Sequence, residues 1–213
     1  MRTAAIMRYW DAPGGRGASH LVAVMEAALA LVKRPLTQRE CLTIMLHDIG
    51  VGREGWSRDD HPLAALDAID HDDGLADIRP LVDEEMRDAI RLHMMDQYRG
   101  LGFVSPLHQL LIEADEGRPV WGPKRIEKPV KYWLDGRNKT LPVNAPIGDV
   151  VSHVTKVILR KIDAFNSGKP PFTCRYCEVF ADDIKSATDW AKSVRDEDVI
   201  ACIEHLRSNG GDK

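Results

Sequence analysis

Six side chains of metal-binding type are spread along the N-terminal part of this 213-residue chain: His20, His47, Asp48, His61, His93 and Asp115. Imidazole and carboxylate groups are ligands that transition metals accept in proteins. Helical bundles build metal sites from side chains that point inward from facing helices. These residues lie within or beside separate apolar stretches of helical periodicity, so the sequence predicts that they can converge on one metal site.

Each of these residues also has a simpler interpretation. A single histidine on a helix face is more often a hydrogen-bonded core or surface residue than a ligand, and the chain holds 8 histidines. The dipeptide His-Asp occurs twice, and the second copy, His71-Asp72, lies in a polar helix end that favours a solvated charge cluster. The first copy follows the mainly apolar residues 42–46 and is predicted to be buried. Asp115 shares a helix face with Leu111, where a buried carboxylate requires a partner.

Apolar residues at three- and four-residue spacing predict helices throughout the chain. They span approximately residues 21–32, 37–48, 61–69, 82–95, 106–114, 147–165, 179–194 and 196–206. Pro35 ends the first of them, and Thr37 with Glu40 forms a capping-box pattern at the start of the second. Alternating strand patterns are nearly absent, so the predicted fold class is all-α.

Composition and pattern divide the chain into four parts: an N-terminal arm at 1–16, a metal-binding core at 17–120, a loop at 121–146 and a C-terminal helical extension at 147–213. The loop is rich in proline, glycine and basic residues, and we expect a long irregular segment or a short hairpin there. The amphipathic extension suits a lid over the site, a homodimer interface or a partner surface.

Overall composition is that of an ordinary folded protein, with 44% hydrophobic and 29% charged residues. The formal net charge of −4 provides no global field for a polyanion, which disfavours binding of bulk duplex DNA. No apolar stretch reaches the length of a signal-peptide core or a membrane span, so we expect a cytoplasmic protein without a membrane partner.

Cys174 and Cys177 form a C-x-x-C pair, which is typical of a turn before a helix or, less often, of a metal or redox site.

The segment 45–50, Met-Leu-His-Asp-Ile-Gly, is preceded by His20 and followed much later by a helical Ala-Asp pair at 114–115. This order resembles the HD-domain superfamily of metal-dependent phosphohydrolases over about residues 17–120. The family signature of a histidine, a His-Asp pair and a distant aspartate maps to His20, His47, Asp48 and Asp115. Members that hold two metals, such as ribonuclease Y and bacterial dinucleoside polyphosphate hydrolases, add two histidines where this chain has His61 and His93. Residues 105–119 are also similar to the last metal-binding helix of ribonuclease Y.

The resemblance implies an HD-domain helical bundle with two metal ions, iron or manganese, bridged by Asp48 as the catalytic residue. His20, His47 and Asp115 would hold one metal, and His61 and His93 the other. The implied activity is that of a phosphodiesterase or nucleotidase, in which a hydroxide activated by both metals attacks a nucleotide or a small nucleic-acid substrate. Basic side chains would bind the substrate phosphates, and the candidates are Arg53, Lys124, Arg125 and Lys128.

Two alternatives remain open at this point. Mixed-valent di-iron oxygenases that act on small polar substrates use the same six-ligand arrangement, and fold and ligands do not separate the two chemistries. The other alternative is a non-catalytic protein that binds metal or a partner. The sequence also departs from the family pattern, because many relatives carry lysine where this chain has Val51, so that phosphate contact is missing or comes from Arg53.

Overall fold

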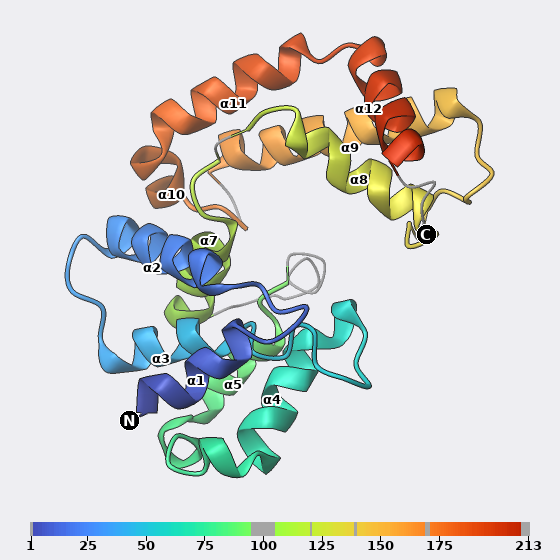
Figure 1. Ribbon diagram of the computed structural model, residues 1–213. Coiled ribbons are helices and arrows are strands. Elements are labelled where there is room, and N and C mark those ends of the chain that lie inside the picture. The colour runs from blue at the N-terminus through green and yellow to red at the C-terminus, as the bar shows by residue number, and fades with distance from the viewer. Residues whose placement is uncertain (1, 95–104, 120, 139, 169–170, 210–213) are drawn as a thin grey trace. The chain divides into compact units, whose positions relative to one another are not determined.

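A computed structural model describes residues 2–94, 105–119, 121–138, 140–168 and 171–209 (Figure 1). Every regular element in these ranges is an α-helix or a short 3-10 turn, which confirms the predicted all-α fold class. The chain forms two compact units, Met1–Gly117 and Arg118–Lys213, which are described one at a time. No helix of the described ranges has both the length and the apolar character needed to cross a membrane.

The N-terminal unit is built from helices whose apolar faces pack on one another. Its described helices are α1 (Arg2–Trp10), α2 (Ala18–Val32), α3 (Gln38–Leu46), α4 (His61–His71), α5 (Glu84–Arg91) and α7 (Pro106–Glu116). Short 3-10 turns occupy Arg58–Asp60, Asp73–Leu75 and Arg79–Leu81. Helix α7 packs against α2, α5 and α3, and α4 packs against α5. Apolar side chains from these helices, among them Leu31, Ile44 and Ile90, are buried and form the core of the unit.

Residues 1–16, which the sequence leads us to treat as an arm, contain the helix α1. Ile6 and Trp10 lie one turn apart on α1 and are both buried. The helix packs against α2, and the Trp10 indole Nε1 donates a hydrogen bond of 2.9 Å to the backbone carbonyl of Met45. Two apolar side chains at helical spacing therefore attach this segment to the rest of the unit.

The start of α3 carries the predicted capping box. The Thr37 hydroxyl accepts a hydrogen bond from the Glu40 backbone N–H at 3.2 Å, and the Glu40 carboxylate accepts one from the Thr37 N–H at 2.8 Å. The Arg34 guanidinium donates to both oxygens of this carboxylate, at 2.7 and 2.8 Å. The helix that leads into His47 and Asp48 is therefore well anchored at its first turn.

The Glu40 carboxylate makes the stability of this helix dependent on pH. Hydrogen bonds from Arg34 and Thr37 outweigh the effect of burial and lower the pKa of Glu40 from its usual 4.5 to about 2. Because the folded-state pKa lies below the unfolded value, the stabilisation is complete above about pH 4.5 and is lost as the pH falls toward about 2. We expect the difference in unfolding free energy between the wild type and Glu40→Gln to be largest near neutral pH and to shrink under acid conditions. Urea denaturation at several pH values measures this difference, and a value independent of pH would contradict the prediction.

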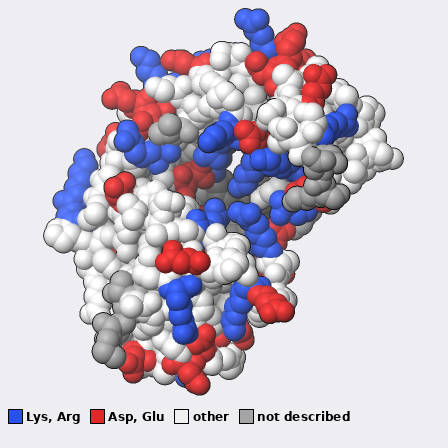
Figure 2. Space-filling view, in the orientation of Figure 1, with Lys and Arg blue, Asp and Glu red and all other residues white. Residues whose placement is uncertain are grey.

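The C-terminal unit contains α8 (Lys124–Leu134), α9 (Ile147–Ser167), α10 (Cys174–Val179), α11 (Ala181–Ser193) and α12 (Asp196–Asn209). Helix α9 packs against α8, α11 and α12. The rings of Phe165, Phe172 and Tyr176 pack together at the end of α9, with centroid separations from 4.7 to 5.9 Å. On the face of this unit seen in Figure 2, basic and acidic side chains are interspersed.

The structure corrects the prediction of an irregular loop over residues 121–146. Lys124–Leu134 form α8, although Pro129 lies inside this helix. Ile126, Val130 and Trp133 share one face of α8 and are buried. Burial of this apolar stripe offsets the hydrogen bond that Pro129 cannot donate, so the proline does not end the helix.

Cys174 and Cys177 lie in the first turn of α10, directly after the N-cap residue Thr173. Neither forms a disulfide, and the Cys177 Sγ donates to the backbone carbonyl of Phe165 at 2.8 Å. Neither cysteine belongs to the groups of potential metal ligands found among the described residues. The sequence predicted a turn before a helix, whereas both cysteines lie within the helix itself.

Candidate metal centre

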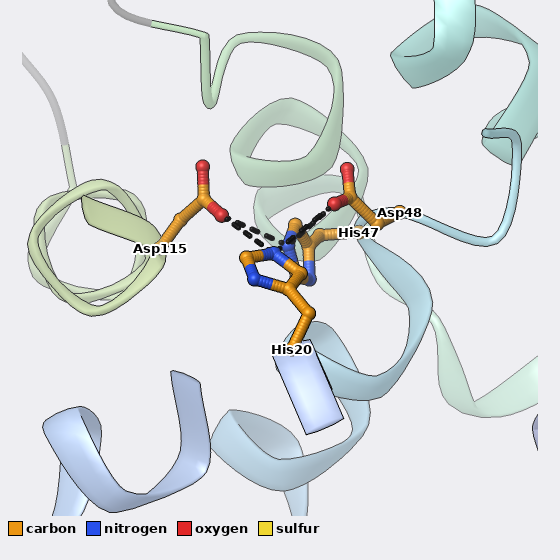
Figure 3. A group of neighbouring side chains, drawn as sticks. All are labelled: His20, His47, Asp48 and Asp115. Carbon is orange, nitrogen blue, oxygen red and sulfur yellow. Dashed lines mark hydrogen bonds and ion pairs between the residues drawn. The ribbon is translucent and has the colours of Figure 1, made fainter. Parts of the chain in front are cut away.

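The residues predicted to bind metal come together in the N-terminal unit, from five helices. His20 lies in the first turn of α2, His47 and Asp48 follow α3, His61 begins α4, His93 follows α5, and Asp115 lies in the last turn of α7. Their donor atoms form a first group of His20, His47, Asp48 and Asp115 and a second group of Asp48, His61 and His93. Within each group these atoms all lie within 4.8 Å of one another. Figure 3 shows the side chains of the first group pointing toward a common centre.

The first group combines two imidazoles with two carboxylates. The His20 Nε2 lies 3.1 Å from Asp115 Oδ1 and 3.3 Å from Asp48 Oδ2. The His47 Nε2 lies 3.5 Å from each of the same two oxygens. Two nitrogen and two oxygen donors therefore face one another at distances that a metal ion placed between them can span.

The second group uses the other oxygen of the same aspartate. The His61 Nε2 lies 2.9 Å from Asp48 Oδ1, and the His93 Nε2 lies 3.5 Å from it. The two imidazole nitrogens are 3.1 Å apart. Asp48 thus directs Oδ2 at the first group and Oδ1 at the second, which is the geometry of a bridging carboxylate.

Backbone carbonyls fix the orientation of three imidazoles. The Nδ1 atoms of His47, His61 and His93 lie 2.6, 2.7 and 2.7 Å from the carbonyl oxygens of the residues three positions earlier. A carbonyl only accepts, so each Nδ1 carries the proton and donates it, and in the neutral ring each Nε2 presents a lone pair to the cluster. Two lone pairs at 3.1 Å, those of His61 and His93, repel each other unless a cation or a proton lies between them. This orientation is the one that metal-binding histidines adopt.

Burial makes the charges of the cluster expensive without a cation. His47, Asp48, His61 and His93 are each at most 3% exposed. Neither oxygen of Asp48 makes a hydrogen bond of good geometry with any of the described residues, and a buried carboxylate whose oxygens lack such bonds is costly. The donor chemistry and this unsatisfied oxygen pair both fit resident metal ions.

The surrounding groups hold both carboxylates in the ionised form. Burial acts to raise the pKa of Asp48, but the positive charge of His47 and contacts with other imidazoles hold that pKa well below its usual value. The pKa of Asp115 is also lowered, since contacts with His20 and His47 outweigh the effect of burial. Burial acts to lower the pKa of His20, but the two carboxylates raise it to about 9. Without a metal, protons on imidazoles balance the carboxylate charge, so metal binding would release protons.

Gly50 allows the turn after Asp48 to approach the start of α4. A Cβ at this position would lie 2.1 Å from the His61 carbonyl oxygen and 2.5 Å from the Ala65 nitrogen. These are backbone atoms, so no side-chain rotation relieves the overlap. The glycine of the His-Asp-Ile-Gly segment therefore permits His61 to lie beside Asp48.

Three residues that the sequence pattern did not indicate contact or support the cluster. Trp10 packs its ring against His20 and His47, with centroid separations of 6.0 and 5.6 Å. The buried His108 lies with its Nε2 2.8 Å from the Leu92 carbonyl, directly before His93. Arg16 lies with its Nε 3.1 Å from Asp48 Oδ2.

One of these contacts could have been predicted. The spacing of Ile6 and Trp10 is typical of the buried face of a helix, whereas no neighbouring residues in the sequence indicate that Arg16 contacts the cluster.

The residues predicted to bind phosphate are divided between the two units, with Arg53 in the N-terminal one. Arg53 donates to the Ala64 carbonyl at 2.9 Å and pairs with Asp67 at 2.7 Å, which ties its guanidinium to α4. Lys124, Arg125 and Lys128 belong to α8 of the C-terminal unit. The Arg125 guanidinium lies over the Trp121 ring at 5.1 Å, and the Lys128 ammonium lies 5.8 Å from the centre of the Tyr132 ring.

Comparisons of the chain with protein-family models, with curated proteins and with solved structures find no match. A functional assignment therefore rests on the chemistry and geometry of the six-residue cluster.

Proposed function

We propose that this chain is a metal-dependent phosphohydrolase of the HD-domain type that cleaves a nucleotide or a small nucleic-acid substrate. The observation that carries the proposal is the position of Asp48, a buried carboxylate whose two oxygens face two separate donor groups. A shared aspartate is what a centre with two metals requires in order to hold both ions close to one substrate group. The order of the six residues along the chain supports the same assignment.

Each donor group has a defined role in this proposal. His20, His47 and Asp115 complete one metal site around Asp48 Oδ2, and His61 and His93 complete the other around Asp48 Oδ1. Mixed imidazole and carboxylate donors suit iron or manganese. Two such ions, when bound, lower the pKa of a water molecule and neutralise the charge that develops on a phosphoryl group. The backbone carbonyls behind His47, His61 and His93 keep the Nε2 atoms directed at the centre, so no reorientation of these rings is needed.

The test begins with metal content. Protein purified without added metal, then loaded with Mn²⁺ or Fe²⁺ and desalted, is expected to hold about two ions per chain by plasma mass spectrometry, one for each donor group. The loaded protein is then assayed without oxygen on a panel of phosphodiesters, nucleoside monophosphates and dinucleoside polyphosphates. Hydrolysis that requires the metal would support the proposal.

Two outcomes would overturn it. A protein that binds no metal after loading would exclude a phosphohydrolase of this kind and leave a partner-binding role. A protein that hydrolyses nothing without oxygen, but consumes oxygen and shows a mixed-valent iron signal, would instead be the di-iron oxygenase that the same ligands permit.

A further inference from the structure

Arg16 connects the surface of the N-terminal unit to its metal centre. The residue lies in the loop between α1 and α2, and its side chain remains 30% exposed. Its Nε nevertheless reaches to 3.1 Å from Asp48 Oδ2, an oxygen of the carboxylate that both donor groups share. Among the described residues, this is the arginine whose guanidinium contacts the cluster.

Glycines allow the loop that carries Arg16 to adopt its conformation. Gly14 and Gly17 have φ angles of 81° and 80°, which side chains rarely tolerate. The Gly15 N–H donates to the Ala12 carbonyl at 2.9 Å, and the Gly17 N–H donates to the Trp10 carbonyl at 3.0 Å. The loop is therefore closed by its own hydrogen bonds on both sides of Arg16.

The same loop packs backbone to backbone on the turn that follows Asp48. A Cβ on Gly52 would lie 2.6 Å from the carbonyl carbon of Gly14, so no side chain fits between the two segments. Gly52 itself has a φ of 78°. The loop of Arg16 thus lies against the turn after Asp48, which brings the two side chains within reach of each other.

Arg16 contacts an oxygen atom, Asp48 Oδ2, that would also bind a metal ion. Asp48 Oδ2 belongs to the first donor group, and the buried Arg16 Nε makes no hydrogen bond of good geometry with any residue that the structure describes. A guanidinium stays charged at any ordinary pH, and it repels a cation bound to the same oxygen. Once that oxygen is bound to metal, Arg16 requires a different anion beside the centre, because a partly buried charge without a partner is unfavourable.

We propose that Arg16 binds the anionic oxygens of the substrate at the metal centre, and that it makes the site selective for a phosphoryl group over a neutral ligand. This inference rests on the proposed function, since it assumes metal at Asp48. The planar guanidinium offers several N–H donors in the geometry that a phosphoryl group accepts. Arg16 thereby takes the role that the sequence suggested for Arg53, whose guanidinium is bound to α4.

The experiment measures binding of inorganic phosphate and of metal separately. Isothermal titration calorimetry follows phosphate binding to the Mn²⁺-loaded wild type, Arg16→Gln, Arg16→Lys and the control Lys33→Gln, which removes an exposed cation at the C-terminal end of α2 in the same unit. We expect Arg16→Gln to weaken phosphate binding about tenfold or more, Arg16→Lys to weaken it less, and the control to leave it nearly unchanged. Mn²⁺ affinity of Arg16→Gln is expected to be equal to or higher than that of the wild type, because the competing guanidinium is gone.

The two measurements distinguish a ligand from a merely structural residue. Weaker Mn²⁺ binding by Arg16→Gln would mean that Arg16 only supports Asp48, and it would overturn the inference. Equal phosphate affinity in the wild type and Arg16→Gln, or equal losses in Arg16→Gln and Lys33→Gln, would also overturn it while leaving the proposed function intact. A wild-type protein that binds no Mn²⁺ would instead remove the proposed function, and this inference with it.

Discussion

Replacement of Asp48 by asparagine is expected to empty both halves of the metal centre. The amide keeps the shape of the side chain but loses the charge that both donor groups share. We expect metal content to fall to near zero and any metal-dependent hydrolysis to fall by about a hundredfold to a thousandfold, the scale of losing one preorganised electrostatic group. The metal-free variant should be less stable than the metal-free wild type at neutral pH, because the Asp48 carboxylate balances the positive charges of Arg16 and the imidazoles around it.

Two further variants make this expectation specific to the bridging position. Asp77→Asn changes an exposed aspartate of the same unit and should retain both ions. His93→Ala removes a ligand of the second group alone, so the first group should still bind one ion. Metal analysis of the three proteins, purified and loaded together, measures all these outcomes. An Asp48→Asn protein that retains half of the wild-type metal would show that the aspartate serves only one group.

Substitution of Gly50 by alanine is expected to destabilise the N-terminal unit strongly, because the added methyl group overlaps the backbone at the start of α4. The added Cβ would overlap the His61 carbonyl oxygen at 2.1 Å and the Ala65 nitrogen at 2.5 Å. The start of α4 must move away from the turn after Asp48, which costs about 3 kcal/mol or more and carries His61 away from its place beside Asp48. We expect a lower unfolding free energy together with preferential loss of the second metal ion.

Gly122→Ala is the matched control for this substitution. A Cβ on Gly122 would meet nothing within 4 Å, so the same added methyl group should change stability little. Denaturant titration and metal analysis of both variants give the two quantities. If Gly50→Ala unfolded like the wild type and retained its full metal content, the close approach of turn and helix would not be needed for the site.

The helices that carry the ligands could be predicted from the sequence because the residues that begin and end them are close in sequence. Proline and capping residues, such as Thr37 with Glu40, lie within a few positions of the helix ends that they set. The candidate metal ligands could be predicted because histidine and aspartate are unusual beside apolar helical stretches. Convergence of these residues was an inference from helix packing, and the structure brings all six together.

The features that the sequence did not predict depend on contacts between distant segments. Helix α8 forms because Ile126, Val130 and Trp133 are buried against the rest of its unit, which outweighs the local signal of Pro129. Arg16 reaches Asp48 across 32 positions of sequence, from a loop with no periodic pattern. Such contacts depend on the tertiary path of the chain. The glycine-rich composition around Arg16 predicts only a turn.

The distribution of the ligands over five helices has a consequence for the folding equilibrium. A metal ion bound by side chains from α2, α3 and α7, or from α3, α4 and α5, ties together segments that the unfolded chain holds far apart. Such an ion binds the folded state alone, so occupancy at a hundred times the dissociation constant adds about 2.7 kcal/mol to stability. A chelator should therefore lower the melting temperature of the N-terminal unit, which supplies these ligands. Metal supply would then determine how long the N-terminal unit persists against proteolysis, and so the abundance of the protein as well as its chemistry.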